Sequence, residues 1–436
     1  MTVFLRASFC VGAALFLTNC AHRSTPETSA ASAKAPALPA PDPSFKVERY
    51  STVVGWPEGK RPTAPEGFEV TRYADGLRNP RWTYVLPNGD VLVAEASSEF
   101  KSEEDKEDSI ESGKVRSQNL GHSANRITLL RDADHDGTPE VREVFLEGVK
   151  QPLGMLLLGD RFYVAGTDAV WRYPYTAGET SLKAPGEKLL ELPAGGYNNH
   201  WTRNLLANAD GSKLYVSVGS ASNVAEHGLK EEERRANILE LNPDGTGERI
   251  YASGLRNPVG MGWAPGTRTL WTAVNERDDL GEDLVPDYLT HVEDGGFYGW
   301  PYAYFGANED PRMAGQRPDL VAKTLVPDVQ LGSHTASLGL AFYEAQAFPE
   351  KYRGGAFIGQ HGSWNRAELS GYKVVFVPFK DGKPSGPPED FLTGFIADAA
   401  QARVHGRPVG VTVLPDGALL VADDASNTLW KVTAKR

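Results

Sequence analysis

Cysteine is nearly absent from this chain of 436 residues, since only Cys10 and Cys20 occur. Both lie within the first 20 residues, so the rest of the chain can form no internal disulfide bond. The fold must therefore depend on a packed apolar core. The composition permits one, because 40% of the residues are hydrophobic and 10% are aromatic. A chain of this length can form one large domain or about two or three ordinary ones.

An excess of basic charge is also lacking. The 45 Lys and Arg residues are outnumbered by 57 Asp and Glu residues, which gives a net charge of −12. This balance disfavours nonspecific binding to nucleic acid, and no basic patch predicts binding to a membrane surface. Part of the acidic charge forms a run from Glu99 to Glu111, whose composition indicates a solvated loop.

Several familiar cofactor and catalytic motifs are missing. The chain has no G-x-G-x-x-G fingerprint, P-loop, C-x-x-C, H-E-x-x-H or G-x-S-x-G sequence. Nicotinamide, nucleotide and ordinary zinc chemistry therefore lack support, as does a serine nucleophile on a strand-to-helix turn.

The apolar run near the N-terminus is too short to span a bilayer, which needs about 20 residues. It extends from Ala7 to Leu17, follows Arg6 and is followed by Cys20. This pattern resembles a bacterial secretory signal that ends in a lipoprotein box. Asn19 departs from the small residue usual before the lipidated cysteine, which leaves a plain secretory signal as the alternative.

Three segments follow from this pattern. Residues 1–20 are expected to be a signal peptide of the lipoprotein type. Residues 21–44 are rich in Ala, Pro, Ser and Thr and are expected to form a disordered tether. Residues 45–436 are expected to form the folded domain. Export would place the protein in the periplasm or, as a lipoprotein, on the outer membrane of a bacterium. An N-terminal lipid would then be its only contact with the membrane.

One cue recurs along the chain: a short polar turn closed by Gly, followed by an apolar, β-branched and aromatic strand. Its six copies lie at residues 86–96, 157–167, 207–220, 264–275, 351–363 and 414–424. Gly-containing turns supply the positive-φ positions of hairpins, and the following runs suit half-buried strands. The spacing matches or exceeds the roughly 40–50 residues of a four-stranded blade. The pattern predicts an all-β fold, a six-bladed β-propeller, with a β-sandwich of unrelated hairpins as the alternative.

Residues 132–143, DADHDGTPEVRE, match the spacing of a calcium loop. Oxygen-bearing side chains alternate around Gly137, which suits an ion that takes about six to eight oxygen ligands. The candidate ligands are Asp132, Asp134, Asp136, Thr138, Glu140 and Glu143. The flanking sequences indicate strands rather than the helices of an EF-hand, so a structural calcium site and a polar hairpin turn are both open.

Several polar side chains lie where predicted strands begin or end. Asn199 and His200 precede a strand, and a histidine whose pKa is near neutrality can act as a general base, with a structural role as the alternative. Arg256 and Asn257 lie in a turn where the planar guanidinium can bind carboxylates. The cluster at residues 275–279 can hold a divalent cation or form structural ion pairs. Weaker candidates are His361, Arg366 and Arg407.

These motifs form an ordered series: HWTRN at 200–204, GLRNP at 254–258, NERDDLGEDL at 275–284, GGFYGWPYAYFG at 295–306 and GRPVGVTVLPDG at 406–417. The series resembles the glucose/sorbosone dehydrogenase family, and the resemblance covers residues 65–435. Members of that family are six-bladed β-propeller enzymes that use pyrroloquinoline quinone (PQQ) and Ca²⁺. The resemblance implies an aldose sugar or an aldehyde such as sorbosone as substrate, and a periplasmic electron acceptor.

The resemblance also implies roles for individual residues. His200 matches the family's general base and Asn199 its neighbour, while Arg256 and Asn257 match a turn that contacts the cofactor and the reacting centre. The family's active-site calcium lies in the loop matched by residues 275–279. Glu276 and Arg277 match positions at that metal. Arg407 matches the first Arg of a cofactor-binding pair, and Val409 occupies the second position. His361 and Arg366 lie near the position of a cofactor-binding Lys.

The leading hypothesis is therefore an exported PQQ- and Ca²⁺-dependent aldose or aldehyde dehydrogenase. Two alternatives remain at this point, because a fold does not fix a function. One is a calcium-dependent lactonase, which would need a central metal held by side chains and no quinone. The other is a noncatalytic propeller that binds a glycan or protein at the cell envelope.

Overall fold

The computed structural model describes residues 37–134 and 136–435. The chain divides into two compact units, residues 1–36 and 37–436, and the described residues belong to the second. The predicted signal peptide and most of the predicted tether thus lie outside the described residues. Contacts begin before the predicted boundary at residue 45, because Leu38 packs against the core and the main-chain N–H of Asp42 donates to Leu280 O at 2.8 Å. Among the described helices, none has the length and apolar character needed to cross a bilayer.

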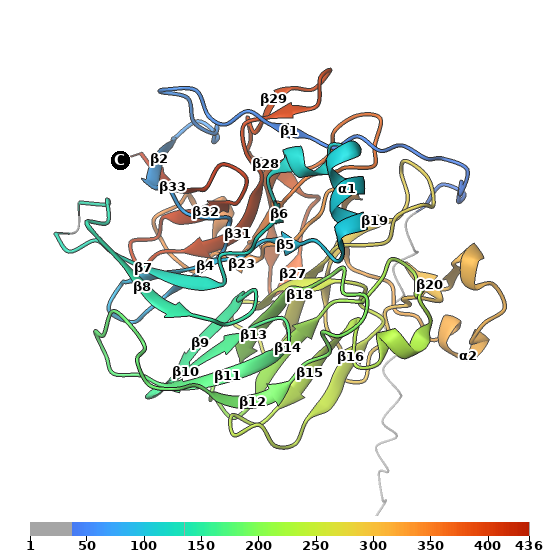
Figure 1. Cartoon of the computed structure of the whole chain (residues 1–436), viewed down its shortest axis with the longest axis horizontal. Helices are drawn as coiled ribbons and strands as arrows, with labels where there is room; N and C mark the ends of the chain where they lie inside the picture. The colour runs from blue at the N-terminus through green and yellow to red at the C-terminus, as the bar shows by residue number, and fades with distance from the viewer. Residues whose placement is uncertain (1–36, 135, 436) are drawn as a thin grey trace, which may run out of the picture. The chain divides into compact units, whose positions relative to one another are not determined.

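The described residues are mostly β-strand, with a few short helices (Figure 1). They include six four-stranded antiparallel sheets. In order from the innermost strand outward, the first three are β3 (Pro80–Val85), β4 (Val91–Glu95), β7 (Arg126–Arg131) and β8 (Val141–Glu147); β9 (Gly154–Leu158), β10 (Arg161–Ala165), β11 (Ala169–Pro174) and β12 (Glu187–Glu191); and β13 (Arg203–Ala207), β14 (Leu214–Val218), β15 (Asn237–Leu241) and β16 (Arg249–Ser253).

The other three sheets come from the second half of the chain and its N-terminal strand. They are β17 (Pro258–Trp263), β18 (Leu270–Val274), β19 (Pro286–His291) and β22 (Val329–Ser333); β23 (Ala341–Phe342), β24 (Ala356–Gln360), β25 (Lys373–Val377) and β28 (Glu389–Leu392); and β31 (Pro408–Val413), β32 (Leu419–Asp423), β33 (Thr428–Ala434) and β2 (Phe68–Ala74).

The innermost strands of these sheets follow one another in a ring. Each of β3, β9, β13, β17, β23 and β31 contacts the next, and β31 contacts β3. The last sheet closes the ring by pairing β2, from the first part of the chain, with the C-terminal strand β33, and the two lie side by side in Figure 1. Such an arrangement of mostly β structure is consistent with a β-propeller.

The turn cues explain why these sheets form. Each of the six predicted copies of the turn-and-strand pattern covers the connection between the first and second strands of one sheet, together with the second strand. Gly89 and Gly417, with φ of +91° and +82°, close two of these turns in a conformation that other residues rarely adopt. The strands that follow are almost entirely buried, as in β4 and β32.

The core lies between neighbouring sheets. One cluster joins Tyr163 and Val170 of the second sheet to Leu214 and Val216 of the third, and others join the remaining neighbours in the same way. Packing is closest near the innermost strands, where a Cβ added to Gly359 would collide with the carbonyl oxygen of Val409. Burial of apolar side chains between the sheets therefore takes the place of disulfide bonds.

Insertions between strands supply the remaining elements. The segment between β4 and β7 contains β5 (Ser98–Glu99), α1 (Glu103–Glu111), η1 (Lys114–Ser117) and β6 (Leu120–Gly121). The acidic run predicted to be a loop is thus largely a helix, because Ser102 caps it by accepting a hydrogen bond from Asp105 N. The short elements elsewhere are β1 (Thr52–Val53), η2 (Leu229–Glu232), β20 (Ala303–Tyr304), β21 (Asn308–Glu309), η3 (Pro311–Met313), α2 (Pro318–Val321), η4 (Glu350–Tyr352), β26 (Phe379–Lys380), β27 (Lys383–Pro384), β29 (Ile396–Asp398) and β30 (Arg403–Val404).

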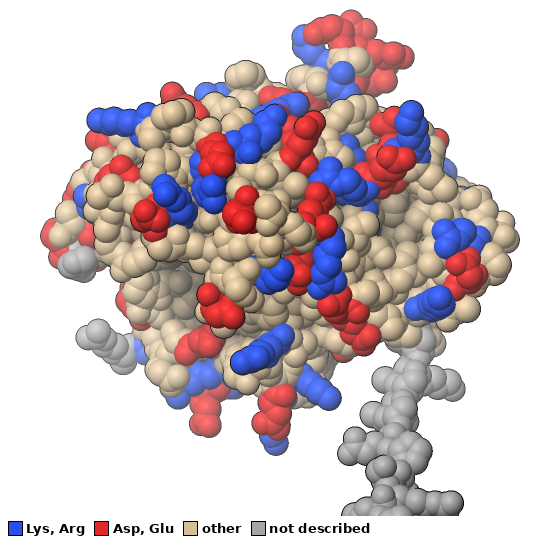
Figure 2. Space-filling view, turned by 90° about the horizontal axis from the view of Figure 1, so that it is seen from below, with Lys and Arg blue, Asp and Glu red and all other residues tan. Residues whose placement is uncertain are grey.

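Charged side chains of both signs are interspersed over the face shown in Figure 2.

Candidate active site

A cavity of about 440 Å³ collects most of the residues singled out in the sequence. Its walls include Asn199, His200, Arg256, Asn257, His361 and Arg407. These residues are distant in the sequence, but each lies shortly before an innermost strand or, for His361, just after the second strand of its sheet. Because the innermost strands follow one another in a ring, their ends converge on one cavity.

His200 is held by the residue that follows strand β14. Its Nδ1 lies 2.9 Å from both the main-chain oxygen and the Oγ of Ser220. The Ser220 hydroxyl donates its own hydrogen to Ser222 O at 2.6 Å, so both Ser220 oxygens accept from the imidazole. The proton therefore resides on Nδ1, and Nε2 carries the lone pair that a general base needs.

The environment of His200 keeps its imidazole neutral. Burial, reinforced by the charge of Arg256, holds the pKa of His200 well below its ordinary value. A neutral imidazole with its lone pair on Nε2 can accept a proton over a wide pH range.

Asn199 does not hold this histidine in the described structure. Its side chain is exposed, and its Oδ1 accepts a hydrogen bond from Lys101 Nζ at 3.4 Å. The residue that orients the imidazole is therefore Ser220 rather than Asn199. No local pattern indicates Ser220, because it lies 20 positions from His200.

Arg256 holds two loops at the cavity wall. Its Nη1 donates to Glu276 O at 2.6 Å, and its Nη2 donates to Asn223 Oδ1 at 3.0 Å and pairs with Asp278 at 3.3 Å. The Nε donates to Asn223 O at 3.2 Å, so the guanidinium is largely committed to the protein. Its predicted contact with a cofactor stays a prediction, and the structure shows it arranging the loops around the site.

Glu276 and Arg277 are turned away from the cavity. The Glu276 carboxylate accepts a hydrogen bond from Arg277 Nε at 3.0 Å, and both side chains are buried. Arg277 also donates to Ala303 O and pairs with Asp310. The structure therefore does not bring these two side chains to the predicted metal position, because they join the loop to the insertion after β19.

Asp278, two positions further along, does line the cavity. It accepts a hydrogen bond from Asn365 Nδ2 at 2.8 Å, and its other contacts are Arg256 and His334 Nδ1 at 3.2 Å. Burial acts to raise the pKa of Asp278, but the His334 hydrogen bond and the charge of Arg256 outweigh it and hold the pKa at about 2. Asp278 is thus an ionised carboxylate that this loop presents to the cavity.

His361 and Arg407 lie together on another part of the wall. Arg407 donates through Nε to His361 O and through Nη2 to Gly362 O, each at 3.0 Å. Its Nη1 makes no hydrogen bond within the described part of the chain. Burial, with the charge of Arg407, lowers the pKa of His361 to about 4. Arg407 therefore presents a cation and a free donor beside a neutral imidazole.

Two residues that the sequence did not indicate support this wall: Arg81, which lines the cavity, and Asp424, which is buried. Asp424 accepts hydrogen bonds from His361 Nε2 at 2.8 Å and from Arg81 Nη1 at 2.7 Å. Burial opposes ionisation of Asp424, but His361 and the guanidinium of Arg81 hold its pKa below the ordinary value. Arg366, by contrast, does not line the cavity and pairs with Asp283 at 3.0 Å. The predicted cofactor contact of Arg366 thus has no support in this arrangement.

The donor set of the cavity fits a ligand that carries carboxylates together with a hard cation. Arg407 and Arg81 offer guanidinium groups, which match carboxylates in shape and charge. The Asn257 Oδ1 atom is buried and has no hydrogen-bond partner among the residues that the structure describes, and an unsatisfied oxygen of this kind suits a cation ligand. Asp278 adds an ionised carboxylate. The residues present are therefore compatible with PQQ and Ca²⁺.

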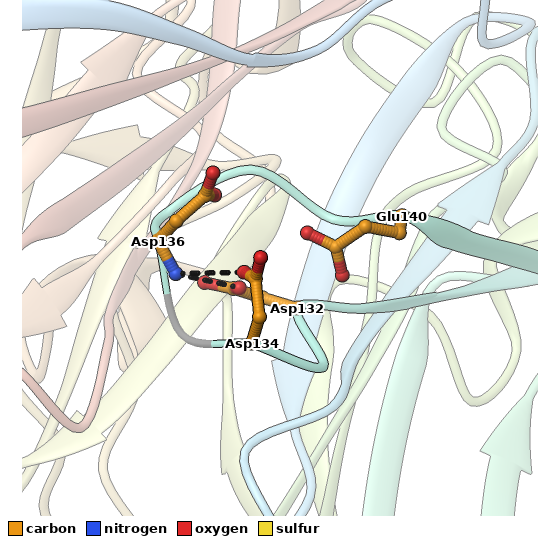
Figure 3. A group of neighbouring side chains, drawn as sticks. All are labelled: Asp132, Asp134, Asp136 and Glu140. Carbon is orange, nitrogen blue, oxygen red and sulfur yellow. Dashed lines mark hydrogen bonds between the residues drawn. The ribbon is translucent and has the colours of Figure 1, made fainter.

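The second predicted calcium site lies at the tip of the hairpin between β7 and β8 (Figure 3). Carboxylate oxygens of Asp132, Asp134, Asp136 and Glu140 lie within 4.8 Å of one another. The Asp132 carboxylate also accepts from the main-chain N–H groups of Asp136 and Gly137. Both readings of this loop, a cation site and a polar turn, are compatible with these contacts. The flanks are strands, as the sequence predicted.

Glu143 does not belong to this group of carboxylates. It lies within β8, is exposed and pairs with Leu129 of β7. The twelfth loop position is therefore part of a strand, because no helix follows the loop as in an EF-hand. Thr138 remains in the turn, where its N–H donates to Asp136 Oδ1 at 2.7 Å.

If the loop binds calcium, millimolar Ca²⁺ will raise the melting temperature, and Asp132→Asn will lower that increase. Loss of one carboxylate removes both a ligand and charge that favours the ion. Differential scanning calorimetry with Ca²⁺ or EDTA measures the shift, and Asp160→Asn, an exposed carboxylate on a different hairpin, is the matched control. If Ca²⁺ raised the melting temperature of wild type and Asp132→Asn equally, the loop would be a polar turn rather than a calcium site.

Comparison with known proteins identifies the family of this chain. The profile of the Glucose / Sorbosone dehydrogenase family matches residues 164–431. An aldose sugar dehydrogenase of Escherichia coli is 31% identical over 197 residues, which cover 45% of this chain and 46% of that enzyme. An uncharacterized protein of Borreliella burgdorferi is 28% identical over 294 residues, 65% of this chain and 76% of that protein.

A solved structure supports the same fold. The holo form of the PQQ domain of pyranose dehydrogenase from Coprinopsis cinerea matches 88% of this chain and 100% of its own with a TM-score of 0.68, at 21% identity. The likeness at this identity concerns the fold. Together with the family profile over more than half of the sequence, it shows that the chain belongs to the glucose/sorbosone dehydrogenase family.

Proposed function

We propose that this protein is a PQQ- and Ca²⁺-dependent dehydrogenase that oxidises an aldose sugar or an aldehyde. The observation that carries the proposal is the convergence of a neutral His200, whose Nε2 is available as a base, and Arg407 in one cavity. Family membership and the aldose sugar dehydrogenase relative support the same activity. The six sheets are then the six blades of a propeller whose central end holds the site.

His200 is the general base in this proposal. Its Nε2 takes the proton of the hydroxyl on the carbon to be oxidised, while Ser220 keeps the Nδ1 proton in place. A positioned base of this kind contributes about 10²- to 10⁴-fold to a rate. PQQ, when bound, supplies the two-electron oxidant that accepts the hydride from that carbon.

The chain's own residues would hold the two cofactors. Arg407 would bind a carboxylate of the quinone, and His361 and Arg81 line the same cavity. The Asp278 carboxylate and the Asn257 Oδ1 atom are hard oxygen donors of the type that calcium prefers, and they would bind the ion. Electrons would leave to a periplasmic acceptor that the chain does not identify.

Reconstitution tests the proposal directly. PQQ and Ca²⁺ are added to metal-free protein, PQQ binding is followed by absorbance, and reduction of an electron-accepting dye is followed across aldoses and simple aldehydes. Binding together with sugar-dependent reduction supports the dehydrogenase. Lactone hydrolysis without quinone binding would support a lactonase, and absence of both would support a binding propeller.

Export remains a proposal that rests on residues 1–20, which lie outside the described residues. Fractionation of cells that express the full chain would test it, with Cys20→Ser as the variant. We expect the wild type in the membrane fraction and Cys20→Ser in the soluble periplasmic fraction. Cytoplasmic retention of both proteins would overturn the proposal.

Replacing Ser220 by Asp will move the acidic limb of the pH–rate profile to higher pH. The pKa of His200 is lowered in the native protein, so the base is lost only when pH falls well below its ordinary range. A carboxylate at Nδ1 favours the imidazolium and raises that pKa, so protonation inactivates the enzyme at a higher pH. The kcat/KM profile between pH 4 and 9 measures the limb.

Ser220→Ala is the matched variant for this test. It retains the main-chain acceptor at 2.9 Å and removes only the hydroxyl. We expect its acidic limb to stay close to that of the wild type, with kcat lowered about tenfold because the ring is held less firmly. An unchanged limb in Ser220→Asp would show that Ser220 does not face the base in solution.

A further inference from the structure

We propose that the substrate of this site is an aldose that bears an anionic group, a carboxylate or a phosphate, bound between Lys101 and Lys114. This inference rests on the proposed function, and it concerns the insertion between β4 and β7. Both lysines line the cavity from that insertion. They lie on either side of α1 in the sequence.

The insertion is docked on the segment that carries the base. Ser98 Oγ accepts a hydrogen bond from Trp201 Nε1 at 2.9 Å. Lys101 Nζ lies 3.9 Å from the centroid of the Tyr197 ring and donates to Asn199 Oδ1 at 3.4 Å. Lys101 is thus held beside the residue that precedes His200.

Lys101 lies on the side of the cavity that carries His200, where the substrate would bind. Strand β31, which follows Arg407, lies three steps around the ring from β13, which follows His200. The base and Arg407, the proposed cofactor anchor, therefore lie on opposite sides of the ring. A group next to Lys101 and the base belongs to the molecule whose proton His200 removes.

The carboxylates of the cavity already have partners. Asp278 pairs with Arg256, and Asp279 pairs with Lys46 at 3.0 Å. Glu226 accepts from two main-chain N–H groups, those of residues 223 and 224. Asp105 accepts from the main-chain N–H of residue 101 at 2.9 Å.

The two ammonium groups, in contrast, have no carboxylate partner among the described residues. Lys106, on the same helix, pairs with Glu103 at 3.0 Å. Burial lowers the pKa of Lys114, and the charge of Lys101 lowers it further against the opposing charge of Asp105. Two ammonium groups that line one cavity and make no salt bridge with a carboxylate of the described residues favour an anion between them.

The test compares matched sugars on the full chain reconstituted with PQQ and Ca²⁺. KM is measured for glucose, glucuronate and glucose 6-phosphate with wild type, Lys101→Met, Lys114→Met and the control Lys106→Met. We expect a lower KM for one of the anionic sugars than for glucose. Each cavity variant should raise that KM by about tenfold, the size of one hydrogen bond to a charged group, with KM for glucose within about twofold.

The two anionic probes distinguish a carboxylate from a phosphate as the recognised group. A wild type that prefers glucose over both would overturn the proposal. Equal increases of KM for glucose and for the anionic sugars would also overturn it. Weaker PQQ binding in the lysine variants, measured by absorbance titration, would assign the lysines to the cofactor and contradict the proposal.

Calorimetry without the cofactor separates this inference from the proposed function. Binding of glucuronate or glucose 6-phosphate to the wild type, and its loss in the double variant Lys101→Met/Lys114→Met, would support the anion site even if no sugar were oxidised. Absence of binding of both anions to the wild type would overturn it. A melting curve of each variant confirms that the fold is retained.

Discussion

His200→Gln will lower kcat about 1,000-fold while PQQ binding stays within about twofold of the wild type. Glutamine can still donate a hydrogen bond to the main-chain oxygen of Ser220, so the local structure should persist. It has no basic nitrogen, however, and the contribution of a positioned general base, about 10²- to 10⁴-fold, is lost. Initial rates of dye reduction at saturating PQQ and Ca²⁺ measure kcat.

His227→Gln is the matched control for this variant. His227 is exposed and its ring packs at a tilt against Tyr197, with ring centroids 4.0 Å apart, but it does not line the cavity. We expect its kcat to remain close to that of the wild type. Retention of more than a tenth of the activity by His200→Gln would remove His200 from the role of base.

The repeated fold was predictable because its signal is local. A polar turn closed by glycine and followed by an apolar strand can be recognised in about a dozen residues, and each copy forms the same turn of one sheet. The closure between β2 and β33 had no such signal. It joins Phe68 to Ala434, and pairing between the two ends depends on the whole ring rather than on either segment.

The candidate site was predictable in part for a similar reason. His200, Arg256 and Arg407 lie directly beside strands, so the sequence placed them at strand ends, and the ring brings those ends together. Their partners were not predictable. Arg81 and Asp424 are separated by 343 positions, and nothing in either local sequence indicates the 2.7 Å contact.

Side-chain direction was the main source of error. Residues 276–279 form one charged cluster in the sequence, but the chain turns Arg277 into a buried pair with Asp310 and leaves Asp278 facing the cavity. Local composition cannot distinguish adjacent positions of an irregular loop. The same limit applies to Arg366, which has the right charge but pairs with Asp283.

The proposed anchoring of PQQ depends strongly on Arg407, because Val409 occupies the position of the second arginine of the family's pair. Arg407→Met should therefore weaken PQQ binding about 100-fold, which corresponds to about 3 kcal/mol. The loss arises because a carboxylate of the ligand would be left in a buried site without its cation. Absorbance titration at saturating Ca²⁺ measures the dissociation constant.

Arg407 also holds the main-chain oxygens of His361 and Gly362, so its loss can loosen the fold as well. Arg407→Lys separates the two effects, since lysine keeps the charge but lacks the planar fork. We expect Arg407→Lys to bind PQQ more tightly than Arg407→Met, and the exposed control Arg403→Met to bind as the wild type does. Because a ligand that binds only the folded state raises its melting temperature, PQQ should stabilise the wild type and Arg403→Met but hardly Arg407→Met. Equal stabilisation of all three would show that the quinone, if bound, is held by other groups of the cavity.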